Sequence, residues 1–113
     1  MTDKKKIYIL GPMRGKENYN FDAFDKARDF LTEIGFMPIS PADLDRFYEN
    51  WEMYPPEGFV PSKELMRDMI MRDLEAVSTS QAVYALKGWE DSKGSAVEMA
   101  LAKFLDLEII IEQ

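Results

Sequence analysis

Residues 7–15 read Ile-Tyr-Ile-Leu-Gly-Pro-Met-Arg-Gly, and this stretch decides the fold. The first four are apolar and rich in β-branched and aromatic side chains, which predicts a buried strand, and Gly11-Pro12 ends it in a loop. Apolar residues then recur at spacings of three and four from Phe24 to Ile34. This spacing predicts a helix that Asn20 caps and Gly35 ends.

The alternation of strand and helix patterns continues along the rest of the chain. We expect strands at 36–39, 82–86 and 109–111, and Pro38 favours an edge or a terminus for the first of them. Helices are expected after Ser62, through Val77, and over 95–105. Such alternation forces right-handed crossovers and a parallel sheet, so the sequence predicts a single α/β domain over residues 1–113.

Composition excludes several kinds of site. The 113 residues are 46% hydrophobic, enough for one core, and contain neither cysteine nor histidine. Disulfides and thiolate metal sites are excluded, and acid–base chemistry must fall to Asp, Glu, Tyr, Lys or water. We expect no metal and no organic cofactor.

The net charge of −7, with scattered Lys and Arg, argues against a polynucleotide partner. No apolar run approaches the roughly 20 residues of a membrane span, and no secretory signal is present. The expectation is a cytoplasmic protein without a membrane partner.

Ligands of open parallel sheets bind outside the carboxyl ends of the strands, where the segments 11–18, 41–61 and 87–94 should meet. In the first segment, Gly11 and Gly15 let backbone N–H groups approach an anion, and the guanidinium of Arg14 suits a phosphate. The alternative is an ordinary turn with a surface arginine. The second segment is long and aromatic, which indicates a function or a short helix of its own.

Asp73 stands in the middle of the apolar stripe of its predicted helix. A carboxylate at a core-facing position is costly unless it is paired or lines a polar crevice. Either Asp73 contributes to a site, or it forms a buried salt bridge, with Arg14 or Arg28 as partner.

Glu98 follows a run of small residues that opens the next helix. Either Ser92 or Ser95 there is suited to cap the helix or to donate to a phosphate. Glu98 shares a helix side with Leu101 and Leu105, so it should face the crevice, and the helix N-terminus favours its ionised form. The alternative is a solvated surface glutamate.

Cleavage of a glycosidic bond needs two carboxyl groups near one crevice. One attacks or stabilises the oxocarbenium-like carbon, and the other donates to the leaving group or orients the sugar. The aromatic segment 41–61 is suited to stack on a base. It is equally suited to cover a satellite core or a subunit interface.

Three motifs resemble the nucleoside 2-deoxyribosyltransferase superfamily: residues 8–15, Met71-Arg72-Asp73-Leu74, and Trp89 through Ser92-x-Gly94-x-x-x-Glu98. The match is closest to its small, often phage- or prophage-encoded members, the DUF4406 domain. The resemblance implies a flavodoxin-like three-layer sandwich with a parallel sheet of about four strands. It also implies a homodimer or higher homo-oligomer and a nucleotide or nucleoside substrate.

The resemblance also implies roles for individual residues. Glu98 falls on the catalytic glutamate, Asp73 on an aspartate that assists it, and Tyr8 on a tyrosine that lines the sugar pocket. Ser92 and the first loop resemble the branch that hydrolyses 2′-deoxynucleoside 5′-monophosphates. The expected substrate-binding residues are Gly11, Met13, Arg14, Gly15, Trp89, Ser92 and Gly94.

The expected function is therefore an N-glycosidase or deoxyribosyltransferase acting on 2′-deoxyribonucleoside 5′-monophosphates. Two alternatives stay open. Gln81 stands where many members carry an aspartate, and the sequence ends just after its last predicted strand, which favours a non-catalytic module that binds a nucleotide or an ADP-ribose-like ligand. The third hypothesis is an interaction protein that uses the aromatic segment as its interface.

Overall fold

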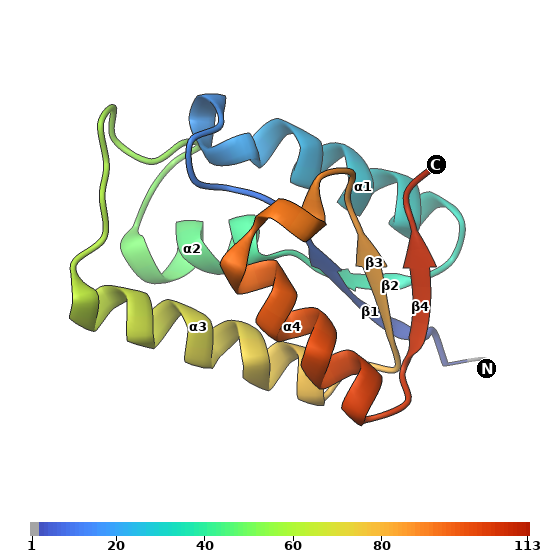
Figure 1. Ribbon diagram of the computed structural model, residues 1–113. Helices are drawn as coiled ribbons and strands as arrows, with labels where there is room; N and C mark the ends of the chain where they lie inside the picture. Colours follow the sequence, from blue (N-terminus) through green and yellow to red (C-terminus); the bar gives the residue numbers. More distant parts are fainter. Residues whose placement is uncertain (1–2) are drawn as a thin grey trace.

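The computed structural model describes residues 3–113 and is shown in Figure 1. Its strands are β1 (Lys6–Leu10), β2 (Met37–Ile39), β3 (Ala82–Ala85) and β4 (Glu108–Ile111). Its α-helices are α1 (Phe21–Glu33), α2 (Pro41–Glu49), α3 (Lys63–Ser78) and α4 (Lys93–Phe104), and two short 3-10 helices cover Glu17–Asn20 and Trp89–Asp91. Every strand and helix predicted from the sequence is present.

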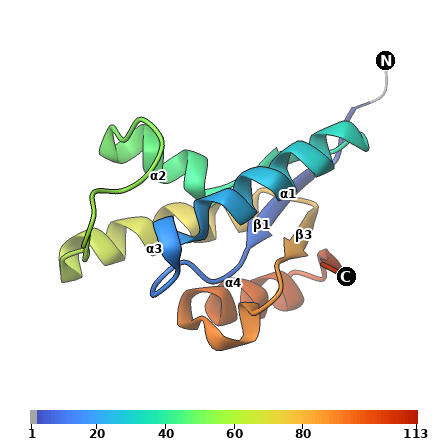
Figure 2. The same cartoon turned by 90° about the horizontal axis from the view of Figure 1, so that it is seen from above.

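The four strands form one parallel sheet in the order β2-β1-β3-β4. The order reverses at β1, as in flavodoxin-like sheets, and β2 with its Pro38 lies at an edge, as predicted. Helices cover both faces, as the view from above shows (Figure 2). The predicted three-layer α/β sandwich is confirmed.

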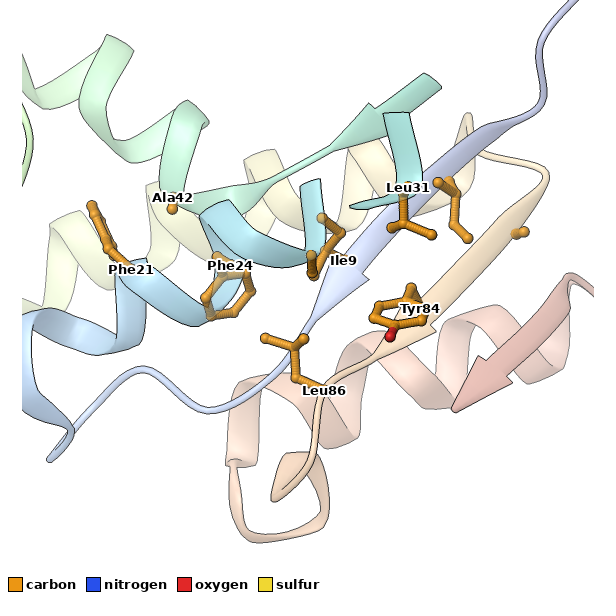
Figure 3. Packing of buried hydrophobic residues seen from close by; sticks show 10 residues of the cluster. Ile9, Phe21, Phe24, Leu31, Ala42, Tyr84 and Leu86 are labelled. Atoms are coloured by element: carbon orange, nitrogen blue, oxygen red, sulfur yellow. The ribbon is translucent and has the colours of Figure 1, made fainter. Parts of the chain in front are cut away.

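Alternate residues of β1 serve opposite faces of the sheet. Ile7 and Ile9 pack with α1 and the start of α2, in the cluster drawn in Figure 3. Tyr8 and Leu10 pack on the other face, against α3 and α4. Because side chains alternate along a strand, the position of Tyr8 is fixed by the burial of its neighbours.

The start of α1 corrects one prediction. Asn20 precedes the helix, but its side chain does not cap it; the amide Nδ2 donates to the Pro12 carbonyl at 2.9 Å. Asn18, Tyr19 and Asn20 all have left-handed backbones, with φ of 52°, 55° and 61°. The chain reverses through this run of left-handed residues, and the Asn20 side chain is used to hold the preceding loop.

The other helix ends agree with the sequence. Gly35, with φ of 104°, lies just past the end of α1, and Ser62 Oγ accepts from the Leu65 N–H at the start of α3. Within residues 3–113, no helix is both long and apolar enough to cross a membrane.

Candidate active site

Tyr8, Asp73 and Glu98 come together on one face of the sheet. Tyr8 lies on β1, Asp73 on α3 and Glu98 on α4, and the two helices pack side by side over this face (Figure 1). The Tyr8 side chain has no exposed surface and Glu98 is 5% exposed. Glu98 is therefore not the solvated surface glutamate that was one reading of its position.

This triad leaves polar atoms without partners. Within residues 3–113, neither the Tyr8 hydroxyl nor Asp73 Oδ1 has a partner in good hydrogen-bond geometry, although both atoms are buried and the Tyr8 hydroxyl lies close enough to Glu98 and Asp73 to affect their pKa values. Buried polar groups in proteins are almost always paired, so each exception requires an explanation. A catalytic or ligand-binding role is one such explanation.

The salt-bridge reading of Asp73 is wrong. In the described part of the chain, no cation lies within ion-pair distance of its carboxyl group. Arg28 is bound instead to a cluster of three other aspartates, Asp25, Asp29 and Asp43. The Arg14 guanidinium donates to the sulfur of Met66.

Burial and mutual repulsion control the protons of the triad. Burial, with the Asp73 charge next, raises the pKa of Glu98 well above its usual range. Burial, with the Asp45 charge next, raises the pKa of Asp73 to about 8. Because two neighbouring carboxylates resist double ionisation, the pair retains a proton near neutral pH.

The helix N-terminus was expected to keep Glu98 ionised, and this expectation is wrong. Glu98 is the sixth residue of α4, in its second turn, and the effect of the helix dipole fades within the first turn. Desolvation has the larger effect here. The pKa of Tyr8 is also raised well above its ordinary value, by burial and by the Glu98 charge.

Another buried carboxylate, besides Glu98, was missed in the sequence. Asp45, on α2, is 5% exposed, and burial raises its pKa to about 7. Its helix lies in the segment 41–61, where the aromatic residues drew attention and a short acidic helix gave no periodic signal. The run Asp43-Leu44-Asp45 offers no pattern that singles out the buried member.

The two glycines of the first loop differ in their surroundings: Gly11 is tightly packed, whereas Gly15 is in open space. A Cβ on Gly11 would lie 2.8 Å from the Leu86 side chain, so glycine is required here for close packing of the strand ends. A Cβ added to Gly15, where φ is 76°, would meet nothing within 4 Å, and Arg14 beside it is exposed. Met13 is half-buried against the core.

Ser92 caps α4. Its Oγ accepts from the Ser95 N–H at 3.2 Å, which is the capping role predicted from the sequence. The space around Gly94 is open, whereas Trp89 packs half-buried against the core on the α3 and α4 side. A Cβ on Gly88, in the same loop, would lie 3.5 Å from Pro12, so the first and third loops meet as predicted.

The aromatic segment is attached to the body of the protein. Trp51 lies edge-on to Phe59 at 4.8 Å and also contacts Phe21 of α1. The Tyr19 hydroxyl donates to the Phe59 carbonyl at 2.9 Å. These contacts support the reading that this segment covers a satellite core, while Phe47, 77% exposed, is available to solvent.

Two of the hollows on the surface of residues 3–113 are large, and neither of these two is lined by the triad. One of about 710 Å³ runs along α3 and includes Tyr48, Arg72 and Leu101. The other, of about 520 Å³, lies between the first loop and residues 55–59, with Tyr19 and Phe59 in its wall. Within residues 3–113, no group of three or more Asp or Glu is arranged to hold a metal ion.

The sequence of this domain identifies its family. Residues 5–111 match the family described as "Domain of unknown function (DUF4406)". The chain belongs to the DUF4406 family. No curated protein matches this DUF4406 chain significantly in sequence.

Two solved structures share the fold of this DUF4406 domain. The 2-deoxyribosyltransferase of the psychrotolerant bacterium Bacillus psychrosaccharolyticus aligns with a TM-score of 0.63 and 22% identity, over 94% of this chain and 70% of that one. The 2-deoxyribosyltransferase of Leishmania mexicana aligns with a TM-score of 0.61 and 16% identity, over 95% of this chain and 63% of that one. The domain thus has the deoxyribosyltransferase fold and spans about two thirds of those chains.

Proposed function

We propose that the protein cleaves the N-glycosidic bond of 2′-deoxyribonucleoside 5′-monophosphates. One observation carries the proposal: the buried Glu98 and the half-buried Asp73, whose Oδ1 is itself buried, share a site with the fully buried Tyr8 hydroxyl. Two neighbouring carboxyl groups of unequal protonation are the requirement of retaining glycoside chemistry. The fold shared with two 2-deoxyribosyltransferases supports the same class of reaction.

The proton retained by the pair is the central element of the mechanism. In the reactive state, Glu98 is the anion and Asp73 the acid, since a single proton is shared by the two. The Glu98 carboxylate attacks C1′ of the sugar, the C1′–N bond breaks, and Asp73 gives its proton to the departing nitrogen. The product of this step is a glycosyl ester on Glu98 and a free base.

The second step distinguishes hydrolysis from transfer. When water attacks C1′, the ionised Asp73 takes its proton and free sugar phosphate leaves; when another base attacks, a new nucleotide forms. Glu98 is released as the carboxylate in both cases. The presence of water at the ester therefore determines which of the two enzymes this is.

Tyr8 has a positioning role in this proposal. Its hydroxyl stays protonated, because burial and the Glu98 charge raise its pKa. A neutral hydroxyl donates to one oxygen of the Glu98 carboxylate, which orients the group and leaves the other oxygen free to attack C1′.

The 5′-phosphate is assigned to the first and third loops. Among residues 3–113, Arg14 has no carboxylate within ion-pair distance, in a chain of net charge −7. Its exposed guanidinium, whose hydrogen-bond partner is the weak acceptor sulfur of Met66, is thus available to an anion. Gly15 and Gly94 leave open space for a phosphate, and the Ser92 hydroxyl, which accepts in the helix cap, keeps its own proton to donate. Met13 and Trp89 border these loops.

Release of free base tests the proposal. The purified protein is incubated with each of the four common deoxynucleoside monophosphates and, separately, with the four deoxynucleosides, and bases are separated by chromatography. We expect release from the monophosphates, a loss of at least about 1,000-fold in Glu98→Gln, and no change in Glu90→Gln, an exposed glutamate in the third loop.

Calorimetry with the same nucleotides separates catalysis from binding. Tight binding of an intact nucleotide, without release of base by the wild-type protein, would replace the proposal by the nucleotide-binding module. Release from deoxynucleosides alone would move the substrate from nucleotides to nucleosides and remove the role of Arg14.

A further inference from the structure

The proposed nucleophile is closed off from solvent. The Tyr8 side chain has no exposed surface, and Glu98 is 5% exposed. A deoxyribose ring that reacts at C1′ must lie in contact with a carboxylate oxygen of Glu98. A ring cannot approach a side chain buried to this degree unless the groups that cover it move. The structure is therefore a closed form of the site, and part of the protein must move before the proposed reaction.

One side-chain contact joins the first loop to α3. Nη2 of Arg14 donates to the sulfur of Met66, which lies in the first turn of the helix. Within residues 3–113 this is the one side-chain hydrogen bond between residues 11–16 and α3, and no ion pair joins them. The first loop follows the strand that carries Tyr8, and α3 carries Asp73. The contact therefore links two of the elements that build the triad.

The first loop is fixed at its base and free at its tip. Gly11 is tightly packed, and the Pro12 carbonyl accepts from Asn20 Nδ2 at 2.9 Å. By contrast, Arg14 and Gly15 are exposed, and a Cβ added to Gly15 would meet nothing within 4 Å. The tip can therefore move without loss of the packing at its base.

The helix on the other side of the contact is weakly packed. Of the 16 residues of α3, all of which the structure describes, Val77 alone is buried, and it lies in the last turn. In α4, over the same face of the sheet, buried residues extend from Ser95 to Ala102. Elements with few buried apolar groups open most easily. Because Pro61, directly before α3, is buried, we expect a small separation from the loop and no unfolding of the helix.

A phosphate dianion is a stronger partner for Arg14 than Met66 is. A thioether sulfur is a weak acceptor, whereas phosphate oxygens accept charge-assisted hydrogen bonds, often two at once from the guanidinium fork. In the described part of the chain, no carboxylate lies within ion-pair distance of Arg14, so phosphate displaces no stronger partner. The phosphate and Met66 compete for the same N–H groups.

We infer that the 5′-phosphate opens the site as well as anchoring the substrate. By taking the Arg14 guanidinium from Met66, it removes the contact between the first loop and α3, and the sugar can then reach Glu98. The inference rests on the proposed function. A ligand shifts an equilibrium only when it binds one state better than the other, and here the open state is the one in which Arg14 is free for phosphate.

Inorganic phosphate tests the inference, because it supplies the anion without the nucleoside. We expect it to raise base release from deoxynucleosides about 3- to 10-fold over chloride at the same ionic strength, the equivalent of one modest hydrogen bond. It should inhibit release from monophosphates, since it occupies the place of their phosphate. A phosphate that served only as an anchor would produce the inhibition without the activation.

Met66→Leu should have the same effect as phosphate. Leucine has a similar volume but no acceptor, so the contact with Arg14 is lost while the apolar packing is kept. We expect faster release from deoxynucleosides in the absence of phosphate, by the same factor, and little further activation when phosphate is added. Met71→Leu is the matched control: Met71 is 63% exposed on the same helix, and its variant should behave as the wild type does. Thermal unfolding verifies that both variants fold.

A distance measurement detects the opening without turnover. The chain has no cysteine, so Lys16→Cys and Arg67→Cys, both at exposed positions, place one spin label on the first loop and one on α3. We expect electron paramagnetic resonance to show a longer distance when phosphate is added, and also in Met66→Leu without phosphate. Labels at Lys26→Cys on α1 and Lys103→Cys on α4 form the control pair, whose distance should stay constant.

The outcomes separate this inference from the proposed function. If phosphate does not activate the cleavage of deoxynucleosides, or if neither phosphate nor Met66→Leu changes the label distance, the opening role of the phosphate is overturned and the proposed function stays intact. If phosphate lengthens the distance but no nucleotide or nucleoside releases its base, the proposed function is overturned while the opening by phosphate stands.

Discussion

Replacing Asp73 by asparagine changes how the stability of the protein depends on pH. In the unfolded chain the carboxyl group ionises near pH 3.8, whereas burial and the Asp45 charge raise its pKa in the folded protein to about 8. Between these values the folded state holds one proton that the unfolded state has lost. The free energy of unfolding therefore falls as pH rises.

The magnitude follows from the proton difference. One bound proton corresponds to about 1.4 kcal/mol for each pH unit, so this single group should remove about 4 kcal/mol of stability between pH 5 and pH 8. Asparagine has nearly the same shape and no charge to bury. We expect Asp73→Asn to match the wild-type protein near pH 4 and to exceed its stability by a few kcal/mol at pH 8.

The assay is urea unfolding at unit steps from pH 4 to pH 8, followed by circular dichroism and by the fluorescence of Trp51 and Trp89. Asp68→Asn is the matched control, since Asp68 is an exposed carboxylate on the same helix, and its curve should run parallel to the wild-type curve. A constant difference between Asp73→Asn and wild type at all pH values would refute the reasoning. The reasoning would also be refuted if the wild-type protein were more stable than Asp73→Asn at pH 8.

Three further predictions concern single groups. Tyr8→Phe should lower base release, because it removes the hydroxyl that orients Glu98, while the free energy of unfolding changes by no more than about 1 kcal/mol, since that hydroxyl has no partner in good hydrogen-bond geometry; Tyr84→Phe, on the adjacent strand, should change neither, and unchanged base release by Tyr8→Phe would contradict the positioning role. Gly11→Ala should lower the thermal midpoint by several degrees or prevent folding, because the added Cβ would lie 2.8 Å from the Leu86 side chain. The control Gly94→Ala, at an open helical position, should leave the stability unchanged or raise it by up to about 1 kcal/mol. Ser92→Ala should cost about 1 kcal/mol in chemical unfolding through loss of the helix cap, and an unchanged stability would contradict the capping role.

The first loop shows why the sequence predicts elements better than contacts. The strand at 7–10 and the turn at Gly11-Pro12 follow from local preferences, which residues 7–15 already contain. The left-handed run at 18–20 does not, because Tyr19 has no local preference for that conformation. The backbone is held there by the contacts of Tyr19 with Phe59 and of Asn20 with Pro12, which local sequence cannot specify.

The sequence by itself determined the α/β class, the parallel sheet and the candidacy of Asp73 and Glu98. These properties depend on periodicity and on the cost of a carboxylate on an apolar stripe, and both can be evaluated along one element at a time. The tertiary structure decided the rest. It showed that Glu98 is buried, that Asp73 has no cation within ion-pair distance in the described chain, and that Asp45 belongs beside them.

The physical reason is the same in all three cases. Desolvation and charge–charge repulsion depend on distances between β1, α2, α3 and α4, which are far apart in the chain and meet only after folding. A helix dipole is local, so the sequence suggested an ionised Glu98; burial is a property of the whole fold, and it reversed the direction of the pKa.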